Sequence, residues 1–249
     1  MYNTITKNQW LKKLQISPTA VPDIFVIHGS MFFNKRVKEI KKFLNSSQVV
    51  PDLPIVLGKL EKQKVGISVA YGGPMASEFA HIFSVLGTKV IIQTGTFGGL
   101  KSELMPGDCC IPKAVFPGDD ASGYYTTKKT VALPTNGQLR NILAEKLQSA
   151  GVSYCSGNVF TTAAMLAESE RDLQSLQRQG YCGIDLETAA VIAVARSFKI
   201  PAAAMLRMGE NLALHQNNIT DKIAAGATTN IALWHIAITA GIEYVSRNK

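Results

Sequence analysis

The sequence lacks the apolar segments that would direct it to a membrane. No uninterrupted apolar run approaches the roughly 20 residues that a membrane-spanning helix requires. The opening residues, MYNTITKNQWLKKLQ, contain no apolar core of a secretory signal peptide. We therefore expect a soluble, cytoplasmic protein with no membrane partner.

Repeats and linkers are missing as well. No internal repeat and no stretch rich in Pro, Gly or Ser divides the 249 residues. With 46% hydrophobic and 18% charged residues, the composition argues against general disorder. Because a chain of this length can bury one sizeable core, we predict a single folded domain.

Metal-binding patterns are also absent from the sequence. The four histidines have no HExxH or similar spacing. The cysteines form no CxxC pair; they are Cys109, Cys110, Cys155 and Cys182. We predict no metal site and expect reduced thiols in the core, with Cys109 and Cys110 on opposite faces of a strand.

Acidic residues are scarce in the first quarter of the chain. Residues 1–64 hold 11 Lys and Arg against 4 Asp and Glu, while the remainder holds 15 against 14, within a formal charge of +8. A basic excess can mark a nucleic-acid surface or an anion site. No zinc-finger, RNA-binding or basic-zipper signature accompanies it, so we expect no nucleic-acid partner. A solvated helix face such as 35–42 is the favoured interpretation.

Short β-rich runs alternate with helical stretches, a pattern typical of α/β domains. We predict strands at 23–28, 55–60, 65–70, 89–93, 109–116, 156–162 and 201–208. We predict helices at 74–86, 138–150, 168–178 and 186–198, and a final helix with an apolar stripe from Ile223 through Ala227 to Val245.

Unusual residues follow three of the predicted strands. Strand 23–28 ends at Gly29, and strand 89–93 is followed by TGTFGG, in which glycines let a ligand approach the backbone and Thr96 offers a hydroxyl. Strand 201–208 delivers Arg207, Gly209, Glu210 and Asn211 at its carboxyl end. Ligands of open α/β sheets bind at the carboxyl ends of strands, so these residues are candidates for one site.

Two carboxylates also enter the very apolar helix predicted at 186–198. Asp185 and Glu187 complement the dipole of a helix N-terminus, which is a sufficient structural reason for them. Glu187 nevertheless neighbours residues that should be buried, and a buried carboxylate is costly without partners. A pair of sugar hydroxyls would be a suitable partner.

Five motifs in order resemble one family. They are VAYGGPMAS at 69–77, VIIQTGTFGGL at 90–100, PGD at 106–108, IDLETAAV at 184–191 and the strand ending in GEN at 209–211. Over residues 23–247 the chain resembles the nucleoside phosphorylase I superfamily, which includes purine nucleoside phosphorylases, uridine phosphorylases and methylthioadenosine/S-adenosylhomocysteine nucleosidases. The resemblance implies a three-layer α/β/α sandwich with a mixed, partly barrel-like sheet over 23–249, after an N-terminal extension at 1–22.

The resemblance also implies roles for residues near the nucleoside. Glu187 would accept hydrogen bonds from the ribose 2′- and 3′-hydroxyls, with Leu186 against the sugar and Asp185 as a neighbouring acid. Glu210 stands where purine-acting members place an Asp that protonates the base. Base contacts would come from 160–166, including Phe160 and Met165. Arg171 belongs to a Ser-Glu-Arg stretch similar to the uracil-reading segment of uridine phosphorylases, so purine and pyrimidine substrates both stay open.

Phosphate would be the second substrate, with no cofactor. Gly29 and Thr96 would bind it, but Gln93 stands where phosphorylases usually carry Arg. Arg36, if the loop after Gly29 carries an insertion, or Lys35 beside it is a candidate replacement, and the alternative is that these cations are solvated. The leading hypothesis is a phosphorylase that converts a nucleoside to base and ribose 1-phosphate.

The alternatives are a hydrolytic nucleosidase, which Gln93 favours, and a catalytically weak nucleoside-binding relative. The nucleosidases' acid after the first glycine is replaced by Met31, Phe32 and Phe33. The resemblance implies a homodimer or homohexamer.

Overall fold

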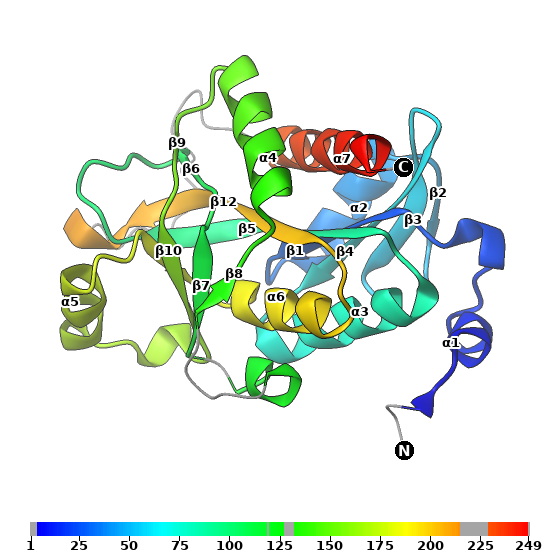
Figure 1. Ribbon diagram of the computed structural model, residues 1–249, viewed down its shortest axis with the longest axis horizontal. Helices are drawn as coiled ribbons and strands as arrows, with labels where there is room; N and C mark the ends of the chain where they lie inside the picture. The colour runs from blue at the N-terminus through cyan, green and yellow to red at the C-terminus, as the bar shows by residue number, and fades with distance from the viewer. Residues whose placement is uncertain (1–3, 119, 127–131, 215–228, 249) are drawn as a thin grey trace.

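A mixed twelve-stranded sheet forms the middle layer of the molecule, with helices on both of its faces (Figure 1). The computed structural model describes residues 4–118, 120–126, 132–214 and 229–248. The strands are β1 (Ile24–Gly29), β2 (Asn45–Val49), β3 (Ile55–Leu60), β4 (Gln63–Ala70), β5 (Val90–Gly99), β6 (Cys109–Cys110), β7 (Ala114–Gly118), β8 (Leu133–Pro134), β9 (Tyr154–Cys155), β10 (Asn158–Thr162), β11 (Gly183–Asp185) and β12 (Ala202–Asn211). The α-helices are α1 (Lys7–Leu14), α2 (Phe33–Phe43), α3 (Gly73–Leu86), α4 (Gly137–Ser149), α5 (Glu170–Arg178), α6 (Thr188–Ser197) and α7 (Asn230–Arg247). The predicted three-layer α/β/α sandwich is confirmed.

The two helical layers bury opposite faces of the strands. Helices α3 and α6 cover one face, called here the α6 face, while α2, α4 and α7 cover the other, called the α7 face (Figure 1). In β1, Phe25 and Ile27 join the core on the α6 face, and Ile24 and Val26 join the core on the α7 face. Strands covered on both faces are apolar throughout, which explains why residues 24–27 form a continuous apolar run.

Strand β5 is the centre of the sheet. Along one edge, its residues 90–94 pair in parallel with β1, and residues 98–99 pair antiparallel with β11. Its other edge pairs in parallel with β12 from residue 91 to residue 99. Strands β1 and β11 therefore share one edge of β5 and diverge beside residues 95–97.

The sheet curls back on itself beyond β5. Strand β12 pairs with β6, while β11 pairs with β10 and β10 with β7. Between β6 and β7, the N–H groups of Ile111 and Lys113 donate to the carbonyls of Cys155 and Gly157 at 3.0 and 2.8 Å. The strands from β6 to β7 thus stay paired with those from β9 to β10. This closed ring is the partly barrel-like form that the resemblance implied.

Several segments differ from the sequence prediction. The strand predicted at 89–93 continues to Gly99, because β12 pairs with it along that length. The strand predicted at 109–116 is divided into β6 and β7 around Pro112, which has no N–H to donate. Helix α7 begins after Thr229, whose hydroxyl caps it at 3.1 Å. The predicted stripe positions Ile223 and Ala227 lie outside the described residues.

Two of the cysteines lie on the strand faces that the sequence predicts. All four are free thiols. Cys109 joins the core on the α7 face and Cys110 the core on the α6 face, as predicted for neighbours in a strand. The domain boundary at residue 22 stays a prediction, although Leu11 and Leu14 of α1 are buried in the same core as α3.

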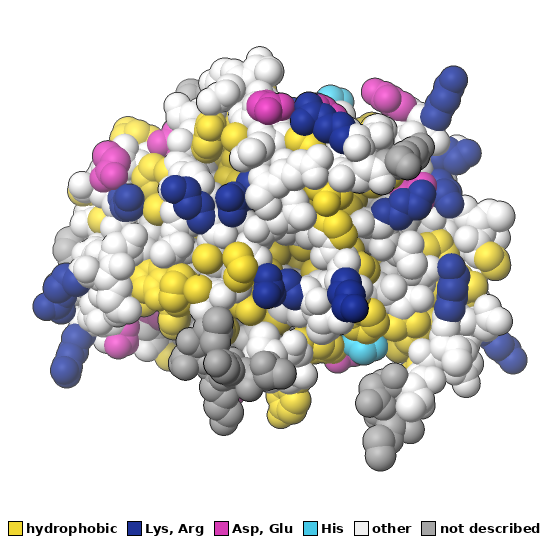
Figure 2. All heavy atoms as spheres, in the orientation of Figure 1, with side chains coloured by type: hydrophobic (Ala, Val, Ile, Leu, Met, Phe, Trp, Pro, Cys, Tyr) yellow, Lys and Arg dark blue, Asp and Glu magenta, His cyan; other side chains and the backbone are white. Residues whose placement is uncertain are grey.

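The basic segment at 35–42 forms most of α2. Lys35 and Lys38 are exposed, whereas Arg36 is half buried. Figure 2 shows that Lys and Arg side chains on the visible face are scattered and do not form one patch. Across the described part of the chain, no helix combines the length and apolarity needed to cross a bilayer.

Replacing Phe83 by Ala should lower the free energy of unfolding by about 3–5 kcal/mol, the usual cost of emptying a large core site. Phe83 of α3 is fully buried and stacks on Phe25 of β1 with ring centroids 3.8 Å apart. Urea denaturation followed by circular dichroism measures the loss. Tyr124→Ala is the control, because Tyr124 is 89% exposed. Similar losses in both variants would contradict the assignment of Phe83 to the core.

Candidate active site

The Glu187 side chain lies where β1 ends and where helices α3 and α6 begin. It precedes α6, and its Oε1 accepts a hydrogen bond from the N–H of Gly72, just before α3, at 2.8 Å. A Cβ atom on Gly29, at the end of β1, would lie 2.5 Å from Oε2, so only glycine admits the carboxylate there. Glu187 is 4% exposed. The structure therefore brings together Glu187 and Gly29, two of the predicted site residues.

Asp185 anchors the segment that carries Glu187. Its Oδ1 accepts the Thr161 hydroxyl at 2.6 Å, and its Oδ2 accepts the N–H groups of Thr188 at 2.9 Å and Glu187 at 3.3 Å. The Thr188 hydroxyl also contacts Oδ2. These bonds satisfy the first N–H groups of α6 and hold Asp185 away from solvent. Asp185 thus positions Glu187.

The two carboxyl groups hold their protons more tightly than exposed acids do. Burial, followed by the charge of Asp185, raises the pKa of Glu187 to about 8, while hydrogen bonds from the Gly72 and Leu186 N–H groups act to lower it. Burial also raises the pKa of Asp185 against the effect of its hydrogen bonds. Hydroxyl donors brought by a ligand would favour the ionised form of Glu187.

Gln93 belongs to this same network on the α6 face of β5. Its Oε1 lies 2.9 Å from the Thr188 hydroxyl, and its Nε2 donates to the Thr94 carbonyl at 3.0 Å. Gln93 is fully buried. Both ends of the amide are therefore engaged within the protein, and the predicted phosphate role of Gln93 stays a prediction.

Cationic side chains gather on the opposite, α7 face of β5. Val90 and Ile92 pack on that face, so Thr96 lies on it too by the two-residue alternation of a strand. Arg207 of β12 is paired in register with Thr96 and is 6% exposed. Arg36 of α2 lies close enough to influence the Arg207 guanidinium electrostatically.

His28 lies within the same group of side chains. Its Nδ1 is 3.1 Å from the Thr94 hydroxyl, and its ring packs edge-on against Trp234 of α7. Burial, and then the charges of Arg36 and Arg207, lower the pKa of His28 to about 3. His28 is therefore neutral, and the positive charge of this region comes from the two arginines.

Glu210 reaches the site because β12 contains a bulge at Gly209. Met208 pairs with Phe97, but the next paired residue is Glu210, opposite Gly98. The extra residue turns Glu210 to the side of β12 that carries Arg207. Glu210 is half buried, and burial raises its pKa.

Glu168 is a neighbour of Glu210 that the sequence interpretation missed. Burial raises the pKa of Glu168 to about 7, the charges of Asp172 and Glu210 act in the same direction, and a hydrogen bond with Thr162 opposes them. Nothing in its sequence context distinguishes Glu168 from a surface acid. Arg207 was expected at the carboxyl end of its strand, but the sequence interpretation gave it no binding role.

The predicted base-contacting residues are more dispersed. Phe160 of β10 packs edge-on against Tyr181, with ring centroids 5.8 Å apart. Met165 is 42% exposed in the segment after β10, and Arg171 is exposed on α5. Leu186 is half buried beside Glu187. Their proposed contacts with a base stay predictions.

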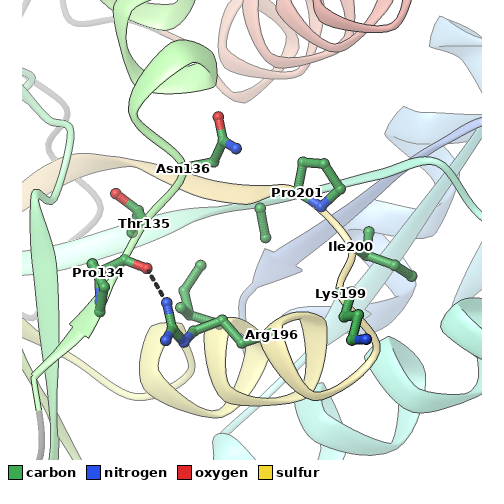
Figure 3. Close-up of a pocket in the computed structure, with 9 residues that line it drawn as sticks. Pro134, Thr135, Asn136, Arg196, Lys199, Ile200 and Pro201 are labelled. Atoms are coloured by element: carbon green, nitrogen blue, oxygen red, sulfur yellow. Dashed lines mark hydrogen bonds between the residues drawn. The ribbon is translucent and has the colours of Figure 1, made fainter. Parts of the chain in front are cut away.

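A pocket of about 390 Å³ lies elsewhere in the fold (Figure 3). Pro134, Thr135, Asn136, Arg196 and Pro201 help to line it, and Arg196 donates to the Pro134 carbonyl at 3.4 Å. It opens beside the first residues of β12, whereas Arg207 and Glu210 lie towards the other end of that strand. No predicted site residue lines this pocket, and we assign it no part in the site.

Comparison with known proteins identifies relatives of the whole fold. A family model described as the phosphorylase superfamily matches residues 23–237. The chain is 22% identical over 167 residues to a DeoD-type 1 purine nucleoside phosphorylase of Shewanella oneidensis, covering 66% of this chain and 71% of that one. It is 23% identical over 198 residues to a 5′-methylthioadenosine/S-adenosylhomocysteine nucleosidase of Buchnera aphidicola, covering 75% and 83%.

A solved structure extends the likeness to the entire chain. The AMP nucleosidase of Bacteroides thetaiotaomicron superposes with a TM-score of 0.75 at 20% identity, covering 100% of this chain and 99% of that one. At this identity the superposition shows a shared fold. Phosphorolytic and hydrolytic enzymes thus both occur among the similar proteins.

Replacing Glu187 by Gln should change how stability depends on pH. Folded Glu187 keeps its proton up to a pKa of about 8, whereas the unfolded residue ionises near 4.5, so wild-type stability falls as pH rises between these values. The Gln variant cannot lose this contribution, and its stability relative to wild type should rise from about pH 5 to about pH 8. Urea midpoints of both proteins across this range test the sign. A constant difference would show that Glu187 is ionised in the folded chain.

Proposed function

The chain belongs to the phosphorylase superfamily, and we propose that it is a nucleoside phosphorylase that cleaves the N-glycosidic bond of a purine or pyrimidine nucleoside. Inorganic phosphate is the second substrate, and the products are the free base and ribose 1-phosphate. The observation that carries the proposal is the buried Glu187 carboxylate between Gly29 and Gly72. A site built so tightly around one acceptor suits a ligand that offers two adjacent hydroxyls.

The position of Glu187 sets the orientation of the ribose. Ribose 2′- and 3′-hydroxyls donate to its carboxylate and so supply partners for the buried acid. This anchors the sugar beside the residues where β1 and β11 diverge along β5. Leu186, half buried next to Glu187, packs against the sugar. A fixed sugar brings C1′ to the phosphate with little further loss of freedom.

Bond cleavage places opposite charges on the two halves of the nucleoside. A phosphate oxygen bonds to C1′ as the C1′–N bond breaks, and the electron pair of that bond passes to the base. Positive charge develops on the ribose, and the anionic phosphate beside Gly29 and Thr96 stabilises it. Arg36 contributes charge from α2. No metal or cofactor is needed for this exchange.

The departing base takes a proton from an acid. Glu210 fits this role, because burial raises its pKa and so favours the protonated form that can donate a proton. Glu168, with a pKa of about 7, lies near enough for the charge of Glu210 to act on it and can supply or share the proton. Phe160, Met165 and Arg171 belong to the segments assigned to the base side.

Hydrolysis at the same bond is the second candidate reaction. The Gln93 amide is buried and engaged by Thr188 and the Thr94 carbonyl, so this position presents no cation to phosphate. Water would then attack C1′ in place of phosphate. The similarity to nucleosidases of methylthioadenosine and AMP fits this reaction.

The proposed enzyme acts in the cytoplasm as a homodimer or homohexamer, without nucleic-acid or membrane partners. Met31, Phe32 and Tyr71 follow the neighbouring strands β1 and β4 and are 51%, 49% and 38% exposed. A second copy covering these side chains would enclose the site. Light scattering should give a mass of at least twice 26.9 kDa. A monomer at micromolar concentration would contradict this part of the proposal.

Base release from the wild type should require phosphate. Purine nucleosides, uridine and methylthioadenosine, each incubated with and without phosphate, are followed by chromatography of the base. Release without phosphate would favour the hydrolytic candidate. Failure to release a base from any of them would contradict both reactions and favour a nucleoside-binding relative.

The Glu187→Gln variant should lose about 100-fold or more in kcat/KM, because the sugar is no longer held for attack. Glu61→Gln is the matched control: Glu61 is exposed in the turn between β3 and β4 and should leave the kinetics unchanged. Circular dichroism confirms that both variants fold. Wild-type activity in Glu187→Gln would overturn the ribose assignment.

A further inference from the structure

The geometry points to Arg207 as the cation that replaces the arginine missing at position 93: together with Arg36, it binds a phosphate group held at Gly29 and Thr96. The inference rests on the proposed function and names the side chains that give that site its phosphate specificity. Arg207 comes from β12, a different strand from the one on which phosphorylases of this family usually carry the arginine. A comparison of aligned positions with those phosphorylases therefore does not identify Arg207.

The strand register places Arg207 beside the phosphate-binding threonine. Arg207 is the paired neighbour of Thr96 across β12 and β5. Paired residues of adjacent parallel strands project from the same face of a sheet, so the guanidinium and the Thr96 hydroxyl share the α7 face. Thr96 is exposed, whereas Arg207 is 6% exposed. An anion bound to the accessible Thr96 would have the buried guanidinium behind it.

Arg36 reaches the surroundings of Arg207 from the helical layer that covers the α7 face. It lies on α2, which follows β1 and its terminal Gly29. Its Nη1 donates to Glu39 at 2.9 Å, and the Asn230 amide of α7, in the orientation that satisfies both groups, accepts from it at 2.9 Å. These contacts hold the Arg36 side chain over the sheet. Arg36 and Arg207 therefore come from different elements to one region.

The charges of the two arginines act on the same neighbours. Arg36 lowers the pKa of Arg207, and both lower the pKa of the buried His28. Two guanidinium groups held near each other away from bulk water repel, and an anion between them is attracted by both. A phosphate group, with several acceptor oxygens, matches two planar donors better than a monovalent anion does.

Gln93 cannot fill this role from its own position. It points to the α6 face, where Thr188 and the Thr94 carbonyl engage its amide. Thr96 and Arg207 lie on the other face of the same sheet. The protein thus has its phosphate cations on the α7 face and its sugar-binding acid on the α6 side of Gly29. That glycine lies against Gly95, whose Cβ would be 3.2 Å from it, so the two sides meet at backbone contact.

Two sources could supply the phosphate group: free inorganic phosphate, or the phosphate of a nucleoside monophosphate. Isothermal titration calorimetry with inorganic phosphate and, separately, with AMP distinguishes them. Arg207→Gln and Arg36→Gln should each weaken binding of the relevant ligand by about 10- to 100-fold, the usual effect of losing hydrogen bonds to a charged group. Arg178→Gln, which changes an arginine on α5, is the control and should bind like wild type.

Uridine and adenosine binding without phosphate separates this inference from the proposed function. Arg207→Gln should bind a nucleoside as wild type does, because Glu187 still holds the sugar. If Arg207→Gln loses phosphate affinity while wild type releases no base, the phosphate site stands and the proposed reaction fails. If wild-type activity depends on phosphate and Arg207→Gln keeps full phosphate affinity, the reaction stands and this inference is overturned.

A second variant and a second measurement cover the case in which Arg207→Gln does not fold. Arg207→Lys keeps the charge but loses the planar fork, and should weaken phosphate binding by about tenfold. A crystal structure of the unchanged chain grown with phosphate should place a phosphate oxygen within hydrogen-bond distance of the Arg207 guanidinium. Phosphate bound by Arg36 and Thr96 alone would overturn the inference.

Discussion

The contact between the Glu187 carboxylate and the end of β1 constrains the rest of the site. A buried acid is tolerated here because the Gly72 N–H donates to it and because Gly29 has no side chain to exclude it. Asp185 fixes the turn that carries Glu187, so two acids lie within one short segment. Each raises the cost of ionising the other. The arrangement therefore favours a ligand that brings its own hydrogen-bond donors.

Strand β5 carries different polar groups on its two faces. On its α6 face Gln93 joins the carboxyl network, and on its α7 face Thr96 is paired with Arg207. Strands β1 and β11 diverge beside residues 95–97, where Gly29 and Gly95 come into backbone contact. The curled sheet is what makes this possible, since β11 returns to β5 through β10 as part of the ring.

The sequence predicted the layers and the burial of Glu187 well, but not how Arg36 and Arg207 are placed. Continuous apolar strands and one-sided helices show which segments are buried, and Glu187 was conspicuous among apolar neighbours. The pattern does not show where a strand ends when its partners are distant in sequence, so β5 was predicted too short. Arg207 was expected at the end of its strand but was given no binding role, for the same reason. Its importance depends on its register with Thr96, which only the folded sheet defines.

The bulge at Gly209 shows how a site can depend on strand register more than on residue type. One residue without a partner in β5 separates Met208 from Glu210 and brings the acid to the side of the strand that carries Arg207. If Gly209 were instead paired with Gly98 as in a regular strand, every reactive group would keep its place along the chain, but Glu210 would turn to the face of β12 on which Met208 packs. A relative with the same residues and no bulge would therefore place its acid on the opposite side of β12 from Arg207.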